Sequence, residues 1–553
     1  MTEPLRTPDQ KTPCELFSDD VRPNRALSSD RVSKRLLLVA GCFAVAFGIT
    51  AGRTAYLSTD PEVVAQFFTT SSAASQLASQ RPARPVPDSR RPEITDRNGQ
   101  LLAADLPSQA LMVDTGRLRD PHGIAQKLAA VLDKGNSAEL VSRLSGRTGH
   151  IRLARRLTPS QVQAIYEIGD PALWLENSVT RAYPAGPLGA HVVGFVNADR
   201  QAQMGLEKGF DTGRAVPTEN TIRTSIDMRI QHVVRRTLLA TQEKFQARAA
   251  VGIVLNAQNG EVLSMVSLPD FDPNQPGGAT GEAQLNRATF GRYEMGSTFK
   301  AFTAAMAIEQ GGMRLTDRVD ASAPIRFARF RIRDHHAKNR VMSVAEVFQY
   351  SSNIGAAKIA VSLGAAAQRK FLGKIGLLER PDLQIPETIR PGQPRRWGEL
   401  ETMTISYGHG LSVSPLQLTA AMAAMVNGGT YFKPTFLAHE DDAQPAGTQV
   451  IKRRTSDKIR KLFRLVVAEG TGRKAAAPGY MVGGKTGTAE IATKTGYDRK
   501  RMVTSFIAAF PMHDPKIITL VLMDTPKGTK ETFGYATAGW TAAPAIAEIV
   551  PQI

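Results

Sequence analysis

Cysteine is nearly absent from this chain of 553 residues, in which only Cys14 and Cys42 occur. Neither a disulfide framework nor a cysteine-ligated zinc site is therefore available after Cys42, and stability must come from packing. Aromatic residues are also scarce, at 6% of the chain. This leaves few rings on which the bases of a single-stranded nucleic acid could stack.

Acidic residues are outnumbered, because 51 Asp and Glu stand against 69 Lys and Arg, a net charge of +18. The stretch before Leu36 holds seven basic and six acidic residues, so nearly all of the excess follows it. Since no arginine-rich stripe interleaved with aromatics accompanies the excess, we expect no nucleic-acid partner. The pattern favours a solvated basic surface that meets anionic polymers or lipids.

One long apolar run is present, from Leu36 to Gly52, with Lys34-Arg35 before it and Arg53 after it. It predicts a transmembrane anchor at 36–57. A cleaved signal peptide is the alternative, but the 35-residue leader and the lack of a small-x-small cleavage site disfavour it. Because basic residues precede the span, residues 1–35 are predicted to be a cytoplasmic tail and everything beyond the span to be exported.

The exported part begins with a stretch rich in Ser, Ala, Gln and Pro, which is typical of a linker. Folded patterning follows, with hairpin turns expected at Asn98-Gly99 and Asn259-Gly260. Helices are expected at 121–132 and 158–168. The strand and helix patterns stop near 214–220, which marks a domain boundary. The predicted parts are a linker at 58–90, a first exported domain at 91–211, a connecting segment at 212–248 and a second domain at 249–553.

Strand patterns recur near the end of the chain, at 481–490, 503–510 and 517–523. Ala- and Leu-rich helical segments fill the interval between Thr298 and Val426. Strands at both ends of a domain with helices between them predict an α+β fold, in which a largely antiparallel sheet is assembled from sequence-distant pieces.

The first candidate for chemistry is Ser297-Thr298-Phe299-Lys300, which opens an Ala-rich helical run. Residues i and i+3 of a helix share a face, so the Lys300 amine can reach the Ser297 hydroxyl. A serine becomes a good nucleophile when a base takes its proton, and a desolvated lysine with a lowered pKa can be that base. Alone, the motif is weak, because a capping serine and a surface lysine share this spacing by chance.

Two further motifs are equally weak by themselves. Ser351-Ser352-Asn353 resembles a helix cap, and Lys485-Thr486-Gly487-Thr488 lies on the predicted strand that begins at Met481. Glycine lets another backbone approach a strand, and an edge strand of this kind can pair with an extended peptide. A second Lys-Thr-Gly at 494–496 has no apolar strand before it, so we interpret it as unrelated.

The order of the three motifs makes them stronger evidence together than apart. Penicillin-binding proteins and class A β-lactamases have this set: S-x-x-K at the start of a helix, then S-x-N, then K-T-G-T on a strand. From about Arg91 to the C-terminus, the chain resembles a class B penicillin-binding protein. The similar stretches are EITDRNG at 93–99, RAYPAG at 181–186, HVVGFV at 191–196, GLE at 205–207, YEMGSTFK, SSNIG, KTGTAE and the closing TAAP. SYGHGLSVSPLQL at 406–418 resembles the division-specific, FtsI-type members, whereas elongation-type members differ there. Pro92 and His409 depart from the family pattern.

The resemblance implies an α+β serine transpeptidase fold, an antiparallel sheet with helices on both sides. An elongated α+β pedestal domain of the dimerisation type and one N-terminal transmembrane helix would precede it. The implied activity is D,D-transpeptidation of peptidoglycan stem peptides through a serine acyl-enzyme. Ser297 would be the nucleophile and Lys300 the general base.

The other site residues also take their roles from the resemblance. Ser351 and Asn353 would carry protons and hold the donor amide, and Lys485 would lower the cost of negative charge. Thr486, Gly487 and Thr488 would bind the substrate and its terminal carboxylate. Backbone N–H groups of Ser297 and Thr488 would form the oxyanion hole, and no metal or cofactor is implied.

The resemblance further implies stem peptides and lipid-linked nascent glycan as substrates, and β-lactams as ligands that acylate Ser297. No stretch before the catalytic domain is long enough for a glycosyltransferase domain, so a membrane glycosyltransferase of the FtsW type and other division proteins are implied as partners. The implied location is the inner membrane, with a cytoplasmic N-terminus and a periplasmic catalytic domain.

Several alternatives remain open at this point. A β-lactamase or a penicillin-sensing receptor would share the three motifs but does not need the domain at 91–211, and a catalytically silent scaffold would not need the motifs. A Ser-His-Asp hydrolase is disfavoured because no G-x-S-x-G surrounds Ser297. A metal site at His335-His336 is disfavoured because adjacent side chains point apart. The sequence GTGRK at 470–474 lacks P-loop spacing and fits a turn.

Overall fold

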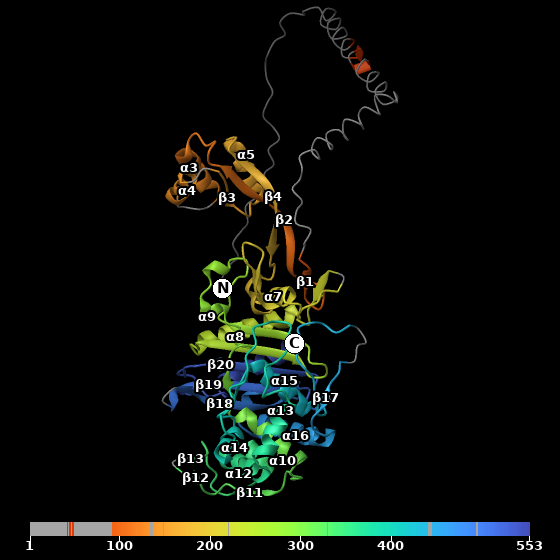
Figure 1. Ribbon diagram of the computed structural model, residues 1–553. Coiled ribbons are helices and arrows are strands. Elements are labelled where there is room, and N and C mark those ends of the chain that lie inside the picture. Colours follow the sequence, from red (N-terminus) through yellow and green to blue (C-terminus); the bar gives the residue numbers. More distant parts are fainter. Residues whose placement is uncertain are drawn as a thin grey trace, which may run out of the picture. The chain divides into compact units, whose positions relative to one another are not determined.

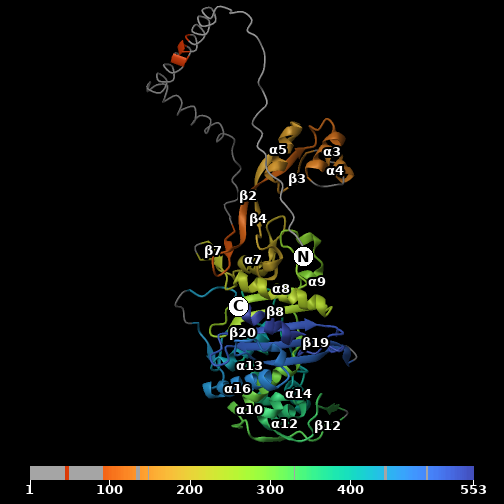
Figure 2. The ribbon, with the colours of Figure 1, turned by 180° about the vertical axis from the view of Figure 1, so that it is seen from behind.

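The computed structural model describes residues 91–553 apart from 133–136, 147–148, 219, 329, 441–444 and 494–495, together with Gly41, Ala44, Val45, Phe47 and Gly48. The predicted tail at 1–35 and linker at 58–90 lie outside the described residues, as does nearly all of the predicted anchor at 36–57. Within the described stretches, no helix has the length and apolar character needed to cross a bilayer. The described residues from Arg91 to Ile553 belong to one compact unit, whose fold is shown in Figure 1 and, from behind, in Figure 2.

The N-terminal part of this unit is built on a five-stranded sheet. Its hairpin is the predicted one, because β1 (Glu93–Thr95) pairs antiparallel with β2 (Leu101–Asp114) across a turn in which Gly99 has φ +83°. Asp96 holds that turn by accepting hydrogen bonds from the N–H groups of Asn98 and Gln100, both at 2.8 Å. The remaining strands are β3 (His150–Ala154), β4 (Leu173–Ala182) and β7 (Thr221–Arg223), of which β3 and β4 pair with β2 and β7 runs parallel to β1.

Both helices predicted in this part are present, as α3 (Pro121–Val131) and α5 (Pro159–Ile168). Each begins with proline after a capping side chain, Asp120 in α3 and Thr158 in α5. These caps satisfy N–H groups that the first turn of a helix leaves unpaired. With α4 (Ser137–Ser145) the helices bury leucine and isoleucine side chains against β2, β3 and β4.

A buried ion-pair cluster lies beside this sheet. The Glu207 carboxylate accepts hydrogen bonds from Nε of Arg91 at 2.7 Å and from Nε of Arg181 at 2.6 Å. Arg181 also contacts Asp105 and donates to the carbonyl of Pro92 at 2.7 Å. The cluster joins the RAYPAG and GLE stretches to the residues just before β1. Only the backbone oxygen of Pro92 takes part, so its departure from the family pattern leaves this contact intact.

The C-terminal part contains the sheet that the sequence predicts. It has five antiparallel strands in the order β18-β19-β20-β8-β9, so the first and last parts of the domain meet at its centre. The β8–β9 hairpin is the one expected at Asn259-Gly260, and the strand patterns predicted at 481–490, 503–510 and 517–523 correspond to β18, β19 and β20. The strands are β8 (Ala249–Asn256), β9 (Val262–Leu268), β18 (Gly483–Thr493), β19 (Gly496–Phe510) and β20 (Ile517–Asp524).

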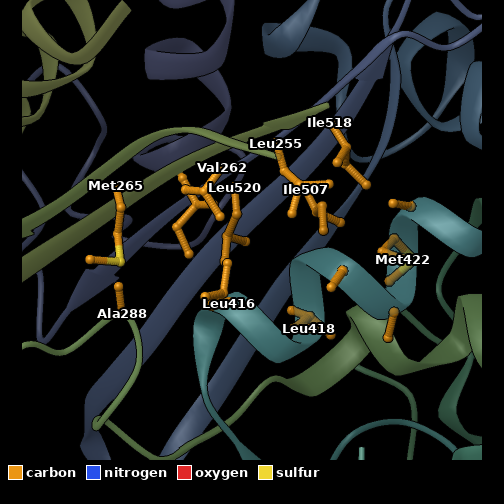
Figure 3. Packing of buried hydrophobic residues seen from close by; sticks show 14 of the residues in the cluster. Leu255, Val262, Met265, Ala288, Leu416, Leu418, Met422, Ile507, Ile518 and Leu520 are labelled. Atoms are coloured by element: carbon orange, nitrogen blue, oxygen red, sulfur yellow. The ribbon is translucent and has the colours of Figure 1, made fainter. Parts of the chain in front are cut away.

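Helices cover both faces of this sheet, as the resemblance predicts. Val251, Ile253 and Leu255 of β8 point to one face, where they pack with α15 (Pro415–Val426), as Figure 3 shows for Leu255. Ala250 and Val254 point to the other, against α8 (Met228–Lys244) and α17 (Ala542–Ile549). A central strand apolar on both sides needs cover on both sides. The domain therefore has three layers, with the sheet between two layers of helices. This layering holds α15 and the helices packed on it in place.

Residues 212–248 contribute β7 to the N-terminal sheet and α8 to the cover of the C-terminal sheet. The remaining helices are α6 (Ala190–Val193), α7 (Gly205–Asp211), α9 (Gly281–Gln284), α10 (Lys300–Glu309), α11 (Val344–Gln349), α12 (Asn353–Leu363), α13 (Ala365–Lys374), α14 (Glu399–Ile405) and α16 (Arg453–Glu469). Short strand pairs are β5 (Phe195–Val196) with β6 (Ala202–Met204), β10 (Tyr293–Glu294) with β15 (Ser412–Val413), β11 (Arg318–Asp320) with β14 (Val341–Ser343), β12 (Ile325–Phe327) with β13 (Phe330–Ile332), and β16 (Thr430–Tyr431) with β17 (Thr448–Gln449).

Replacing Glu207 should destabilise the fold. Glu207→Gln removes the carboxylate shared by two arginines whose side chains are 9% and 1% exposed, but Arg91 keeps Asp211 and Arg181 keeps Asp105, so we expect a cost below the about 3–5 kcal/mol of a buried charge with no partner. We expect a clear fall in the midpoint of thermal unfolding of the full chain, followed by circular dichroism. Glu531→Gln is the control, because it breaks an exposed pair with Lys244 that is worth at most about 1 kcal/mol. Equal midpoints for both variants would contradict the prediction.

Candidate active site

The predicted nucleophile lies at the start of a helix on the face of the sheet covered by α15. Ser297 is in a 3₁₀ turn, η3 (Gly296–Phe299), and Lys300 is the first residue of α10. Nζ of Lys300 is 2.9 Å from Oγ of Ser297. The i, i+3 contact that the spacing predicts is therefore present, with the 3₁₀ turn bringing the two side chains onto one side.

Lys300 also joins the first motif to the second. Its Nζ lies 2.7 Å from the carbonyl oxygen of Ser351, 3.0 Å from the Ser351 hydroxyl and 2.6 Å from Oδ1 of Asn353. Two of these neighbours are carbonyl-type oxygens, which can only accept. A neutral amine has two hydrogens, and the two carbonyl oxygens take both. Its one lone pair is then left for a hydroxyl, and Ser297 can donate its proton to it.

The orientation of the Asn353 amide is fixed by a second contact. Its Nδ2 donates to the carbonyl of Arg333 at 3.1 Å, which leaves Oδ1 for Lys300. Because a carbonyl oxygen cannot donate, the opposite orientation would place two acceptors against each other. The amide thus holds Lys300 from one side.

Ser351 stands between the two lysines of the site. Nζ of Lys485, on β18, donates to Oγ of Ser351 at 3.1 Å, opposite the contact with Lys300. Ser351 has φ +59°, a left-handed conformation that few residues other than glycine adopt. This backbone geometry turns both its carbonyl and its hydroxyl toward Lys300. The hydroxyl is placed to pass a proton between the two ammonium positions.

Both lysines are buried, and burial changes their titration. Burial lowers the pKa of Lys300 well below its usual 10.5, and the charge of Lys485 lowers it further, while the Asp334 carboxylate opposes the shift. Burial lowers the pKa of Lys485 from 10.5 to about 7. Repulsion between the two ammonium groups is mutual and disfavours charge on both lysines at once. The site therefore favours one neutral amine and one ammonium, and the amine that contacts Ser297 is that of Lys300.

The third motif reaches the nucleophile because β18 and η3 approach closely. A Cβ on Gly487 would lie 2.6 Å from the carbonyl oxygen of Met295. A Cβ on Gly296, whose φ is +54°, would lie 2.6 Å from the carbonyl oxygen of Thr488. Glycine is required at both positions, since real Cβ atoms do not make such contacts. The backbone of the nucleophile thus lies against the backbone of Thr488.

The two threonines of the third motif are held by neighbouring loops. The hydroxyls of Thr486 and Thr471 are 2.8 Å apart, and the Thr488 hydroxyl accepts from the N–H of Ala538 at 3.3 Å. Thr471 belongs to the GTGRK stretch, which forms a turn as expected and supplies a side chain that the sequence did not indicate. In the second Lys-Thr-Gly, Lys494 and Thr495 lie outside the described residues.

Asp334 is a residue of the site that sequence reasoning missed. One of its oxygens accepts from the Ser352 hydroxyl at 2.7 Å, and the other accepts from the N–H groups of Asn353 at 2.6 Å and Ile354 at 3.0 Å. A carboxylate at these amides offsets the partial positive charge of the start of α12 and fixes the S-x-N segment in place. Asp334 lies 17 positions before Ser351 and belongs to no sequence motif, so the sequence alone could not indicate it.

His409, which departs from the family pattern, lies in an aromatic cluster near Lys300. Its ring is 5.3 Å from that of Tyr407 and 5.5 Å from that of Tyr497, whose hydroxyl donates to Glu294. Burial, followed by the charge of Lys300, lowers the pKa of His409 to about 4. The ring is therefore neutral at neutral pH and adds no charge to the site.

Among the described residues, no group of three His, Cys, Asp or Glu side chains is placed to hold a metal ion. His335 and His336 lie in the exposed loop after β13. The site instead brings together Ser297, Lys300, Ser351, Asn353 and Lys485 from three distant segments. This arrangement can activate a serine, accept its proton and return a proton to a leaving group.

Comparison with known proteins agrees with this geometry. The penicillin-binding protein transpeptidase domain matches residues 250–549, and the penicillin-binding protein dimerisation domain matches residues 87–216. The chain resembles penicillin-binding protein 3 of Mycobacterium tuberculosis in complex with aztreonam, with a TM-score of 0.65 at 23% identity, over 84% of this chain and 95% of the other. This likeness supports the fold.

Curated relatives carry the family assignment further. A probable peptidoglycan D,D-transpeptidase FtsI of Caulobacter vibrioides is 37% identical over 84% of this chain and 80% of its own. Stage V sporulation protein D of Bacillus subtilis is 30% identical over 95% of this chain and 86% of its own. The FtsI of Escherichia coli K12 is 28% identical over 92% and 90%. The chain therefore belongs to the penicillin-binding protein transpeptidase family, as a class B serine D,D-transpeptidase of peptidoglycan with a dimerisation domain before its catalytic domain.

Proposed function

We propose that this enzyme cross-links stem peptides during septal cell-wall synthesis, and that Ser297 is its acylated nucleophile. The hydrogen bonds of Lys300 to Ser297, Ser351 and Asn353 carry the catalytic part of the proposal, because they join two motifs around one proton acceptor. The similarity of 406–418 to division-type members, together with two FtsI relatives, supports the septal role.

In the first step, Oγ of Ser297 attacks the carbonyl carbon between two terminal D-alanines. Its proton passes to the neutral amine of Lys300, and negative charge develops on the carbonyl oxygen, where the N–H groups of Ser297 and Thr488 stabilise it. The carbon–nitrogen bond then breaks. Ser351 hands a proton to the departing amine and recovers one from Lys300, so D-alanine leaves and an ester to Ser297 remains.

In the second step, an amine of a neighbouring strand attacks the ester. Lys300, neutral again, accepts a proton from that amine through Ser351, and Ser297 leaves as a hydroxyl when it is reprotonated. The charge of Lys485 and the hydroxyls of Thr486 and Thr488 hold the terminal carboxylate of the donor during the first step, while Gly487 lets the donor lie along β18. Asn353 contacts both Lys300 and the donor amide.

The proposed setting follows from the N-terminal sequence. An anchor at 36–57 with a cytoplasmic tail would hold the catalytic domain in the periplasm, beside the lipid-linked nascent glycan. A membrane glycosyltransferase of the FtsW type would supply the glycan strands. Other division proteins would then direct the pair to the septum.

β-Lactams should acylate Ser297, because their ring amide resembles the bond that the enzyme cleaves. We expect full-length chain in detergent to gain the mass of benzylpenicillin after brief exposure, and Ser297→Ala to gain none. Intact-mass spectrometry measures both. Loss of the antibiotic without an adduct would favour a β-lactamase, and an unchanged protein with unchanged antibiotic would favour a silent scaffold.

Acylation should depend on pH through both lysines. The rate rises as pH passes the pKa of Lys300, since only the neutral amine accepts a proton, and falls as Lys485 loses its charge near its pKa of about 7. The profile of second-order acylation by a chromogenic cephalosporin should therefore be bell-shaped, with limits that belong to the coupled pair. Lys485→Arg keeps the charge at all accessible pH values and should lose the alkaline limb. The same alkaline limb in that variant would contradict the assignment.

Depletion of the chain in its own host should reveal the cellular role. A septal enzyme is needed to close the division site, so we expect cells that elongate into filaments, scored by microscopy. Complementation by the wild type but not by Ser297→Ala would tie the phenotype to catalysis. Round or bulging cells would assign the enzyme to elongation instead.

A further inference from the structure

The hairpin of β12 and β13 has two chemically different faces. Ile325, Phe327 and Ile332 point inward, where they pack on Met403, Ala357 and Tyr407. Because side chains alternate along a strand, Arg326 and Arg331 point to the opposite, solvent-exposed face. The inner face explains why the hairpin lies on α12 and α14, as Figure 2 shows, and the outer face is free for other contacts.

The two arginines on the outer face stand directly opposite each other in the register of the hairpin. Like charges in this position are destabilising. Neither guanidinium forms an ion pair with any acidic residue of the described chain, and the exposed Arg333 follows them. Six Lys and Arg and one acidic residue, Asp334, occur between positions 326 and 340. Asp334 is occupied by the start of α12 and Arg340 pairs with Glu346, so within the described residues no carboxylate neutralises Arg326 and Arg331.

This charge lies at the edge of the active site. The carbonyl of Arg333 holds the Asn353 amide at 3.1 Å, and the next residue, Asp334, holds Ser352. Tyr407, against which the hairpin packs, neighbours His409. The two arginines are on the opposite face of the hairpin from these contacts, so a carboxylate would meet them on a part of an extended substrate that leaves the site past Asn353, away from the reacting bond.

We propose that Arg326 and Arg331 bind a carboxylate of the stem peptide away from its D-alanyl end, and so select acidic over amidated peptides. The inference rests on the proposed peptidoglycan transpeptidase function and adds a determinant of specificity to it. Two guanidinium groups on one face suit a carboxylate, because each presents a planar pair of donors. The carboxylate can belong to the peptide that acylates Ser297 or to the peptide that resolves the ester.

The test uses full-length chain in detergent and two synthetic pentapeptides that end in D-Ala-D-Ala. They differ only at the second residue, where one has a free carboxylate and the other a carboxamide. In the donor arm each is cleaved in turn and kcat/KM is measured from released D-alanine. In the acceptor arm one amidated donor is kept, and the transfer rate to acidic and amidated acceptor peptides is compared.

We expect the wild type to prefer the acidic peptide about three- to tenfold in one arm, the size that two exposed ion pairs provide. The preference should shrink as salt is raised. Arg326→Gln/Arg331→Gln should bring the ratio close to one, and Arg326→Lys/Arg331→Lys should retain part of it. Lys452→Gln/Arg454→Gln is the matched control, because it removes two exposed charges at the start of α16 and should keep the full ratio.

Two outcomes would overturn the inference while leaving the proposed function intact. One is equal use of acidic and amidated peptides by the wild type in both arms. The other is a preference that survives in the Arg326→Gln/Arg331→Gln protein. Failure of the wild type to form a penicillin adduct or to release D-alanine from either peptide would instead reject the function on which the inference rests.

Discussion

The structure depends on one physical constraint, the burial of two lysine side chains around a single serine hydroxyl. Lys300 and Lys485 are 2% and 0% exposed, and Ser351 lies between their amines. Taking an ammonium out of water is costly, so at least one of these groups must give up its proton readily. This cost makes nucleophilic catalysis possible, because the same desolvation that disfavours charge produces a base next to Ser297.

The fold holds these groups in place. Ser297 lies in the 3₁₀ turn before α10, Ser351 precedes α12 and Lys485 extends from an edge strand, so three separate elements must be fixed to within hydrogen-bond tolerance. The helix–sheet–helix layering does this by packing α15 against the central strands (Figure 3). Asp334 completes the arrangement from outside the layers, by holding the start of α12. Contacts far from the serine are therefore part of what makes the serine reactive.

Much of this could be predicted from the sequence. Strand patterns and Asn-Gly turns predicted the β1–β2 hairpin and the five strands of the C-terminal sheet, and helical patterns predicted α3 and α5, because these signals act locally. The strands β3 and β4 were not predicted. The motif order identified Ser297, Lys300 and the third motif. Asp334, Thr471 and the arginine pair of the β12–β13 hairpin could not be found in this way, since their roles arise only when distant segments meet. The left-handed conformation of Ser351 was equally hidden, because serine has no strong preference for it.

That conformation has a consequence for how this protein can change. A non-glycine residue in the left-handed region costs the fold about 1–3 kcal/mol, and glycine at position 351 would relieve the strain. Glycine would also remove the hydroxyl between the two lysines. Stability and activity thus compete at a single backbone position. Variants selected only for thermal robustness would tend to drift toward an enzyme that is well folded and inert.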